Sequence, residues 1–261
     1  MRLIDSRVLA PDSTARRAIA RVVANQAGSR GLLVFAAADT HVHWIATCSR
    51  EVAGELARRI GGSLSKRLRL PVAFEASRFV PVWDQAHLTR AVLYVLRQRE
   101  HHDVSADPTL DGTSLPDLLG WRLLGPNADA YVARTAALLP RLRRTDFLEL
   151  AGLGELQPAA EARADLAEAA AAAFGLAEVS GITRAHVLAK RAAVHAGLRC
   201  DVHLDTIAAS LRVCLRSAQR MRAEPADDGA VKAVGYQLAI RATLRRRGAE
   251  REQDVPLRRS A

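Results

Sequence analysis

Four residues in the N-terminal part of the chain have types and spacings suited to metal-assisted phosphate chemistry: His41, His43, Tyr94 and Gln98. Side chains alternate between the two faces of a strand, so His41 and His43 would point to the same side and could bind one divalent cation. Tyr94 and Gln98 are one helical turn apart and would share a helix face. If that helix packs along the sheet, Gln98 supplies a third ligand and Tyr94 faces the bound substrate.

Each pattern also has an ordinary explanation, and the residues alone leave both open. A His-x-His pair in a strand is often incidental, a helical Tyr is often half-buried packing, and a helical Gln is often solvated. Arg90 lies one turn before Tyr94 and would contact a phosphate. The combination of both motifs in a basic protein favours the chemical interpretation.

The elements that must position these residues follow from apolar periodicity and from caps. We expect an antiparallel sheet with helices on one face, an α+β fold, because buried strands and amphipathic helices alternate along the chain. A short β-compatible segment at 2–9 comes first. The other expected elements are a helix at 13–26, strands at 32–37 and 41–48, a helix at 51–68, a hairpin at 72–82 and a helix at 84–99.

The composition favours a polyanionic partner. The chain has 261 residues, is 49% hydrophobic and carries a formal net charge of +10. Such a charge points first to nucleic acid and second to a membrane surface, while simple solubility charge is the plain alternative. The three scattered cysteines form no Cys-x-x-Cys pair, which fits a reducing cytoplasm. No apolar run is long enough to predict a membrane span.

The two motifs and their setting resemble the HUH single-tyrosine transposases, in particular the insertion-sequence and REP-associated members. The similarity covers about residues 1–105 and includes the strand Gly31–Ala36 before the histidines and the segment Phe79–Asp84 before the tyrosine helix. The chain departs from the family at Asp39-Thr40, where Pro-Asn is usual. It also has Gln98 where Asn is frequent, a change that keeps a carbonyl ligand.

This resemblance implies cleavage and rejoining of single-stranded hairpin DNA through a 5′-phosphotyrosine on Tyr94. His41, His43 and Gln98 would hold Mg²⁺ or Mn²⁺, and mixed imidazole and oxygen ligands permit either. Arg90 and the basic residues of the helix at 51–68 would contact DNA. Those basic residues are Arg58, Arg59, Lys66 and Arg67.

The second half is expected to be helical and to contain a helix-turn-helix at 204–220. Ile207, Leu211 and Ala218 would be core positions, and Arg212 would occupy the turn where Gly is usual. The segment Lys190–Arg247 is similar to the C-terminal DNA-binding module of bacterial replication initiators. Two ordinary packed helices are the alternative. The residues expected to face DNA are Arg216, Ser217, Gln219 and Arg220.

The expected organisation has four parts: a catalytic domain at 1–105, a connector with short helices at 106–145, a helical domain at 146–247 and a disordered tail at 248–261. Three functions stay open, namely an active or domesticated transposase, a non-catalytic DNA-binding regulator, and another HUH nuclease such as a plasmid replication protein. A monomer and a homodimer both remain open.

Overall fold

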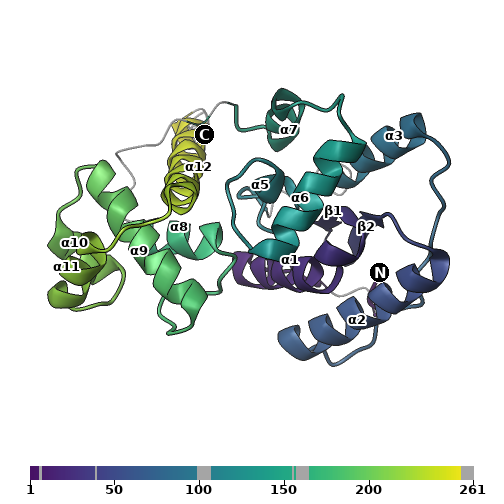
Figure 1. Ribbon diagram of the computed structural model, residues 1–261, viewed down its shortest axis with the longest axis horizontal. Coiled ribbons are helices and arrows are strands. Elements are labelled where there is room, and N and C mark those ends of the chain that lie inside the picture. The colour runs from purple at the N-terminus through teal and green to yellow at the C-terminus, as the bar shows by residue number, and fades with distance from the viewer. Residues whose placement is uncertain (6–7, 39, 99–106, 155, 157–164, 254–261) are drawn as a thin grey trace, which may run out of the picture.

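The protein is mostly helical with one small antiparallel sheet, which confirms the α+β class. A computed structural model describes residues 1–5, 8–38, 40–98, 107–154, 156 and 165–253. The sheet and helices α1 to α3 lie at one end of the molecule, and α9 to α11 lie at the other (Figure 1). Among the helices that the structure describes, none combines the length and apolar character needed to cross a bilayer.

The sheet consists of β1 (Leu32–Ala37) and β2 (Val42–Ala46), paired antiparallel with Ala36 opposite His43. Helices cover both of its faces, so the expectation of helices on one face is wrong. Phe35 packs in the core formed with α1 and α2, whereas Val34 packs in the core formed with α3. The cause is the continuous apolar run of β1, since a strand that is apolar on both faces must be covered on both.

Three N-terminal helices begin at side-chain caps. They are α1 (Ser13–Ala27), α2 (Arg50–Leu68) and α3 (Gln85–Leu96). Asp12 accepts a hydrogen bond from the backbone N–H of Ala15 at 2.7 Å, and Asp84 accepts one from His87 at 2.7 Å. Each cap satisfies a donor that a helix N-terminus would otherwise leave unpaired. A short 3-10 turn, η1 (Gly28–Arg30), leads into β1.

The segment between α2 and α3 is not the expected hairpin. Within it the structure has one isolated bridge, between Leu3 and Phe74, and residues 75–83 are extended coil. Prolines at 71 and 81 remove backbone donors on either side of the expected turn, which disfavours a paired ladder. The first residues likewise form bridges, including Arg2 to His41, and no continuous strand.

Residues 107–139, most of the expected connector, pack against the sheet. This stretch contains α5 (Leu115–Leu118) and α6 (Pro126–Leu138). Arg122 is buried and donates to Asp117 at 2.8 Å, and the Tyr131 hydroxyl donates to the same carboxylate. Although burial disfavours its charge, Arg122 has a raised pKa because of Asp117. Burial and the same carboxylate also raise the pKa of Tyr131.

The C-terminal half is built from helices, as expected. They are α7 (Arg144–Ala151), α8 (Leu166–Ala173), α9 (Arg184–Arg199), α10 (Leu204–Ser210), α11 (Leu215–Ala223) and α12 (Asp228–Gln253). Residues 157–164, just before α8, lie outside the described part. The expected disordered tail at 248–261 is wrong for 248–253, which continue α12, while 254–261 lie outside the described residues.

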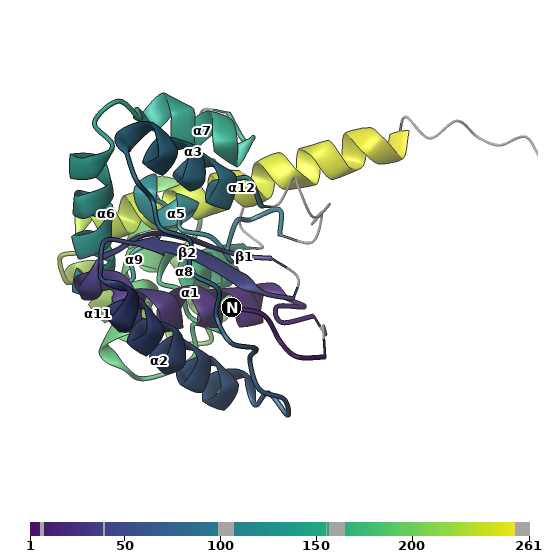
Figure 2. The same cartoon turned by 90° about the vertical axis from the view of Figure 1, so that its right-hand side faces the viewer.

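Helix α12 connects the two ends of the molecule. Its first half, including Val231 and Val234, belongs to the core of α8 and α9. Ala239 and Ile240 belong to the core that contains β1 and α3. The Gln237 side chain donates to the Trp121 carbonyl at 3.1 Å, and the last turns extend beyond the body of the molecule (Figure 2). One helix therefore contributes to the packing of both halves.

Candidate active site and nucleic-acid interface

The two histidines meet on one face of β2, as strand alternation predicts. The Nε2 atoms of His41 and His43 are 2.6 Å apart, with ring centroids 4.4 Å apart. Thr40 Oγ1 lies 3.1 Å from Nδ1 of His41 and helps to fix that ring. This contact is a hydrogen bond between the two rings, in which one Nε2 donates to the other.

Helix α3 brings the tyrosine to this pair. Val92 and Val95 bury its inner face against β1, which fixes the helix along the sheet. The Tyr94 ring meets the edge of His43, with centroids 6.0 Å apart and planes at 85°. Tyr94 remains 50% exposed, so the nucleophile predicted from the sequence is accessible to a substrate.

Gln98 lies just beyond α3 and is only 1% exposed. Its Nε2 donates to the Tyr94 carbonyl at 3.2 Å, whereas its Oε1 is buried with no hydrogen-bond partner among the described residues. A buried acceptor without a partner costs free energy, so such an atom needs an explanation. A cation ligand role, as predicted, is one that fits this oxygen.

Of the three predicted ligands, His41 and His43 contact each other, whereas Gln98 donates to the Tyr94 carbonyl. Within the described ranges, no group of three or more His, Cys, Asp or Glu residues could hold a metal. The expected site instead combines two imidazoles with one carboxamide. Mixed nitrogen and oxygen donors of this kind suit Mn²⁺ and also permit Mg²⁺.

A groove of about 850 Å³ opens beside the tyrosine. It lies between β2, α3 and the coil at 77–84, and both His43 and Tyr94 line it. The sequence analysis did not assign Arg50, Arg78 or Trp83, which also line this groove. A tryptophan directly before a helix cap was the only signal in the sequence that pointed to an exposed aromatic residue here.

The basic residues predicted to contact DNA lie in different places. Arg90 is exposed on α3, and Lys66 is exposed near the end of α2. Arg58 lines a second hollow of about 490 Å³ between α2 and residues 73–79. Arg59 forms an ion pair with Glu55 one turn earlier on the same helix.

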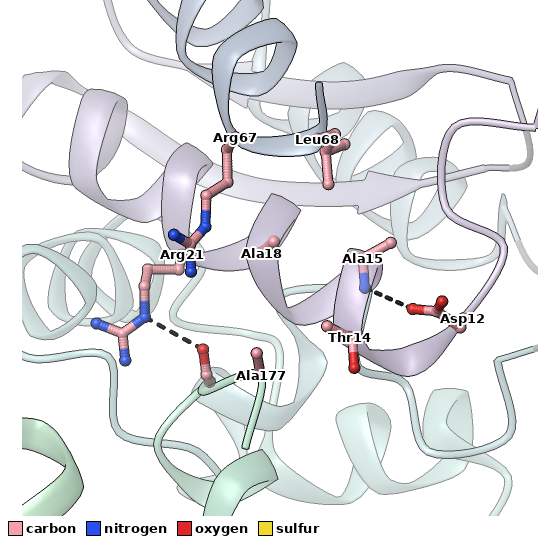
Figure 3. A pocket seen from close by; sticks show the side chains of 9 residues that line it. Asp12, Thr14, Ala15, Ala18, Arg21, Arg67, Leu68 and Ala177 are labelled. Atoms are coloured by element: carbon pink, nitrogen blue, oxygen red, sulfur yellow. Dashed lines mark hydrogen bonds between the residues drawn. The ribbon is translucent and has the colours of Figure 1, made fainter. Parts of the chain in front are cut away.

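Arg67 lines a separate pocket of about 260 Å³ (Figure 3). There Arg21 donates from Nε to the Gly175 carbonyl at 3.1 Å and so binds the end of α8. Burial, and then the charge of Arg67, lowers the pKa of Arg21. This pocket shares no lining residue with the groove beside Tyr94, so Arg67 is not part of that site.

The predicted helix-turn-helix corresponds to α10 and α11. Ile207, Leu211 and Ala218 are buried as expected. Arg212 has a φ of 53°, the left-handed conformation predicted for the turn. The N–H of Val213 bonds to the carbonyl of Ala208 at 3.0 Å, which ends α10 in a Schellman motif.

The exposed face of α11 is basic. Arg216, Gln219 and Arg220 are exposed, and Ser217 is partly buried. The Ser217 hydroxyl lies 3.2 Å from the Cys214 thiol, and this hydrogen bond lowers the pKa of that thiol. The four residues predicted to face DNA thus lie on the second helix of the motif, three of them fully accessible.

Comparisons of the chain with protein-family models, with curated proteins and with solved structures found no match.

Proposed function

We propose that the protein cleaves and rejoins single-stranded DNA, with Tyr94 as the nucleophile, as an HUH-type strand transferase. The observation that carries the proposal is the meeting of His41, His43 and Tyr94 beside a groove. The unpartnered Oε1 of Gln98, one turn after Tyr94, supports a third ligand. The charge of +10 supports a nucleic-acid substrate.

In this proposal the Tyr94 oxygen attacks the scissile phosphorus. A P–O bond to tyrosine forms, the P–O bond to the 3′ oxygen breaks, and the products are a 5′-phosphotyrosine and a free 3′-OH. The phenol loses its proton to solvent, which reaches this half-exposed residue, and the leaving 3′ oxygen takes up a proton from solvent. A divalent cation held by His41, His43 and Gln98 would polarise the phosphate and stabilise its developing charge.

The same linkage allows rejoining. The phosphodiester energy is kept in the bond between Tyr94 and phosphorus, so a 3′-OH can attack that phosphorus and release the phenol. No nucleotide cofactor is needed for this exchange. Because β2 and α3 pack against each other, His43 and Tyr94 keep their relative position through both steps.

The test is a covalent adduct assay with single-stranded hairpin oligonucleotides and Mn²⁺. Wild type should form a protein–DNA adduct that survives denaturing electrophoresis, and Tyr94→Phe should form none. The His41→Ala/His43→Ala double variant should reduce adduct formation by at least about 100-fold. Tyr236→Phe changes another tyrosine, one that packs against the core containing β1 and α3. It is the matched control and should retain the adduct. An adduct in Tyr94→Phe would show that the nucleophile is assigned wrongly.

A second candidate function is regulation by duplex DNA binding without cleavage. The exposed basic face of α11, after the left-handed turn at Arg212, favours it. Arg216→Ala and Arg220→Ala should each weaken duplex binding. Each should also reduce the magnitude of the slope of log binding constant against log salt concentration by about one. Retained duplex binding without any adduct on hairpin DNA would favour this function over strand transfer.

A further inference from the structure

The groove beside Tyr94 contains an aromatic side chain that the cleavage proposal does not use. Trp83 is 79% exposed, and Val80 on the same coil is 67% exposed. Both line the groove together with Tyr94. A tryptophan this exposed leaves a large apolar ring face in water, which favours a partner that covers it.

The coil that carries Trp83 is fixed at both ends. Phe79 meets Trp44 of β2 edge-on, with ring centroids 6.1 Å apart and planes at 70°. At the other end Asp84 caps α3, and the backbone N–H of Trp83 donates to Nδ1 of His87 at 3.5 Å. Trp83 is thereby held on the groove while its ring stays uncovered.

The charges along the groove suit a phosphate backbone. Arg50 and Arg78 line it, and Asp84, the one acid among the described residues that line it, is engaged as the α3 cap. The hollow of about 490 Å³ under α2 shares Met1, Ser77 and Phe79 with this groove. That hollow adds Arg58 and the acid Glu75. The two hollows are therefore adjacent, and together we call them the track from Tyr94 to α2.

We propose that this track binds unpaired nucleotides next to the cleaved phosphate and that Trp83 stacks on one nucleobase. Stacking on an aromatic ring requires an exposed base face, which single strands offer and paired duplexes do not. Arg78 and Arg50 then contact the backbone on either side of the stacked base. The inference rests on the proposed strand transfer for the location of the cleaved phosphate, but the binding itself needs no chemistry.

Binding is tested without cleavage, in Tyr94→Phe protein with EDTA, using fluorescein-labelled single strands. In that background Trp83→Ala should weaken single-strand binding by roughly 5- to 100-fold, the range expected for loss of one base stack, and Trp83→Phe should retain most of the affinity. Ile182→Ala, which removes another highly exposed apolar side chain (92%), is the matched control and should bind normally. Duplex affinity should not change in any of the three.

A second measurement locates the stack. Single strands should quench tryptophan fluorescence in the Tyr94→Phe protein, and most of this quenching should disappear in Trp83→Phe. Single strands that each carry one abasic site should include one position at which removal of the base weakens binding as much as Trp83→Ala does. Arg78→Ala should reduce the magnitude of the slope of log binding constant against log salt concentration by about 0.7.

The inference is overturned if Trp83→Ala binds single strands as tightly as Ile182→Ala, or if it weakens duplex binding equally. It is also overturned if Trp83→Ala instead abolishes a concentration-dependent dimer seen by light scattering, since a second copy would then cover the ring. If no adduct forms under any condition but the Trp83 effects appear as described, strand transfer fails and the single-strand track stands.

Discussion

At the scale of single residues, Tyr94 and Gln98 are one turn apart but have opposite environments. Tyr94 is half exposed, as a nucleophile must be to reach a substrate, whereas Gln98 is buried. The backbone carbonyl of Tyr94 accepts a hydrogen bond from the Gln98 side chain. The orientation of that side chain therefore depends on Tyr94. The buried Oε1 of Gln98, which has no hydrogen-bond partner among the described residues, is therefore the atom at which to test a metal-ligand role.

Gln98→Met should separate a metal ligand from an ordinary buried amide. In metal-free protein the variant removes an unpaired buried acceptor, so the free energy of unfolding should stay equal or rise by about 1 kcal/mol. Added Mn²⁺ should stabilise wild type by about 2.7 kcal/mol at a hundredfold excess over the dissociation constant, and much less in the variant. Thermal unfolding with and without Mn²⁺ measures both. Equal stabilisation of the two proteins would exclude Gln98 as a ligand.

Asp84 should make the stability of the tyrosine helix pH-dependent. The hydrogen bond from the His87 backbone lowers the pKa of this carboxyl below its ordinary 3.8. An acid with a lowered folded pKa stabilises the fold above its ordinary pKa, and this contribution is lost as pH falls through the folded pKa. Wild type should therefore have a higher urea midpoint than Asp84→Ala at neutral pH. The difference between the two midpoints should shrink at acidic pH. Asp84→Asn, which keeps the cap but not the charge, is the control.

At the scale of elements, local signals in the sequence predicted the parts that depend on local chemistry. Asp12 and Asp84 mark the starts of α1 and α3, and the apolar run from Leu32 marks β1. A left-handed Arg212 was expected because this residue stands where the turn of a helix-turn-helix usually has Gly, and its φ of 53° agrees. The periods of strand and helix predicted which side chains share a face, and the contact of His43 with Tyr94 followed on the condition that the helix packs along the sheet, as α3 does.

The parts that sequence reasoning missed depend on contacts between distant residues. Nothing local shows that Arg122 would be buried against Asp117 beneath the sheet, so residues 107–139 were taken as a connector. The hairpin at 72–82 was predicted with Glu75-Ala76-Ser77 at its turn, but Pro71 and Pro81 remove backbone donors on either side of that turn. The exposure of Trp83 depends on how Phe79 and Asp84 fix the coil, which no periodicity indicates.

Removing one partner of the buried pair should show how strongly α5 and α6 depend on it. Arg122→Met leaves the Asp117 carboxylate buried without its cation, and the free energy of unfolding should fall by about 3–5 kcal/mol. The double variant Arg122→Met/Asp117→Leu should recover much of this loss because no charge remains buried. Chemical denaturation of the three proteins measures the effect.

Arg59→Ala is the surface control for that experiment. Its ion pair with Glu55 is about 40% exposed on each side, and loss of such a pair costs about 0.5 kcal/mol or less. If Arg122→Met and Arg59→Ala destabilise the protein equally, the buried pair does not hold the segment at 107–139 in place.

At the scale of the whole molecule, α12 should make the two halves unfold together. Val234 packs in the core of α8 and α9, and Ile240 packs in the core of β1 and α3. The three tryptophans all lie in the N-terminal half, at positions 44, 83 and 121, so fluorescence reports on that half. Far-UV circular dichroism reports on every helix. The two denaturation curves should coincide, and separate midpoints would show independent halves.

In the proposed function, a single helix shared by two cores would also set a distance along DNA. If α11 holds a duplex while Tyr94 cleaves an adjoining single strand, α12 prevents the two contacts from moving apart independently. The offset between the recognised duplex and the broken phosphodiester would then be a property of the protein, counted in a constant number of nucleotides. Inserting nucleotides between the two DNA elements would displace the cut from its original sequence while leaving its distance from the duplex unchanged.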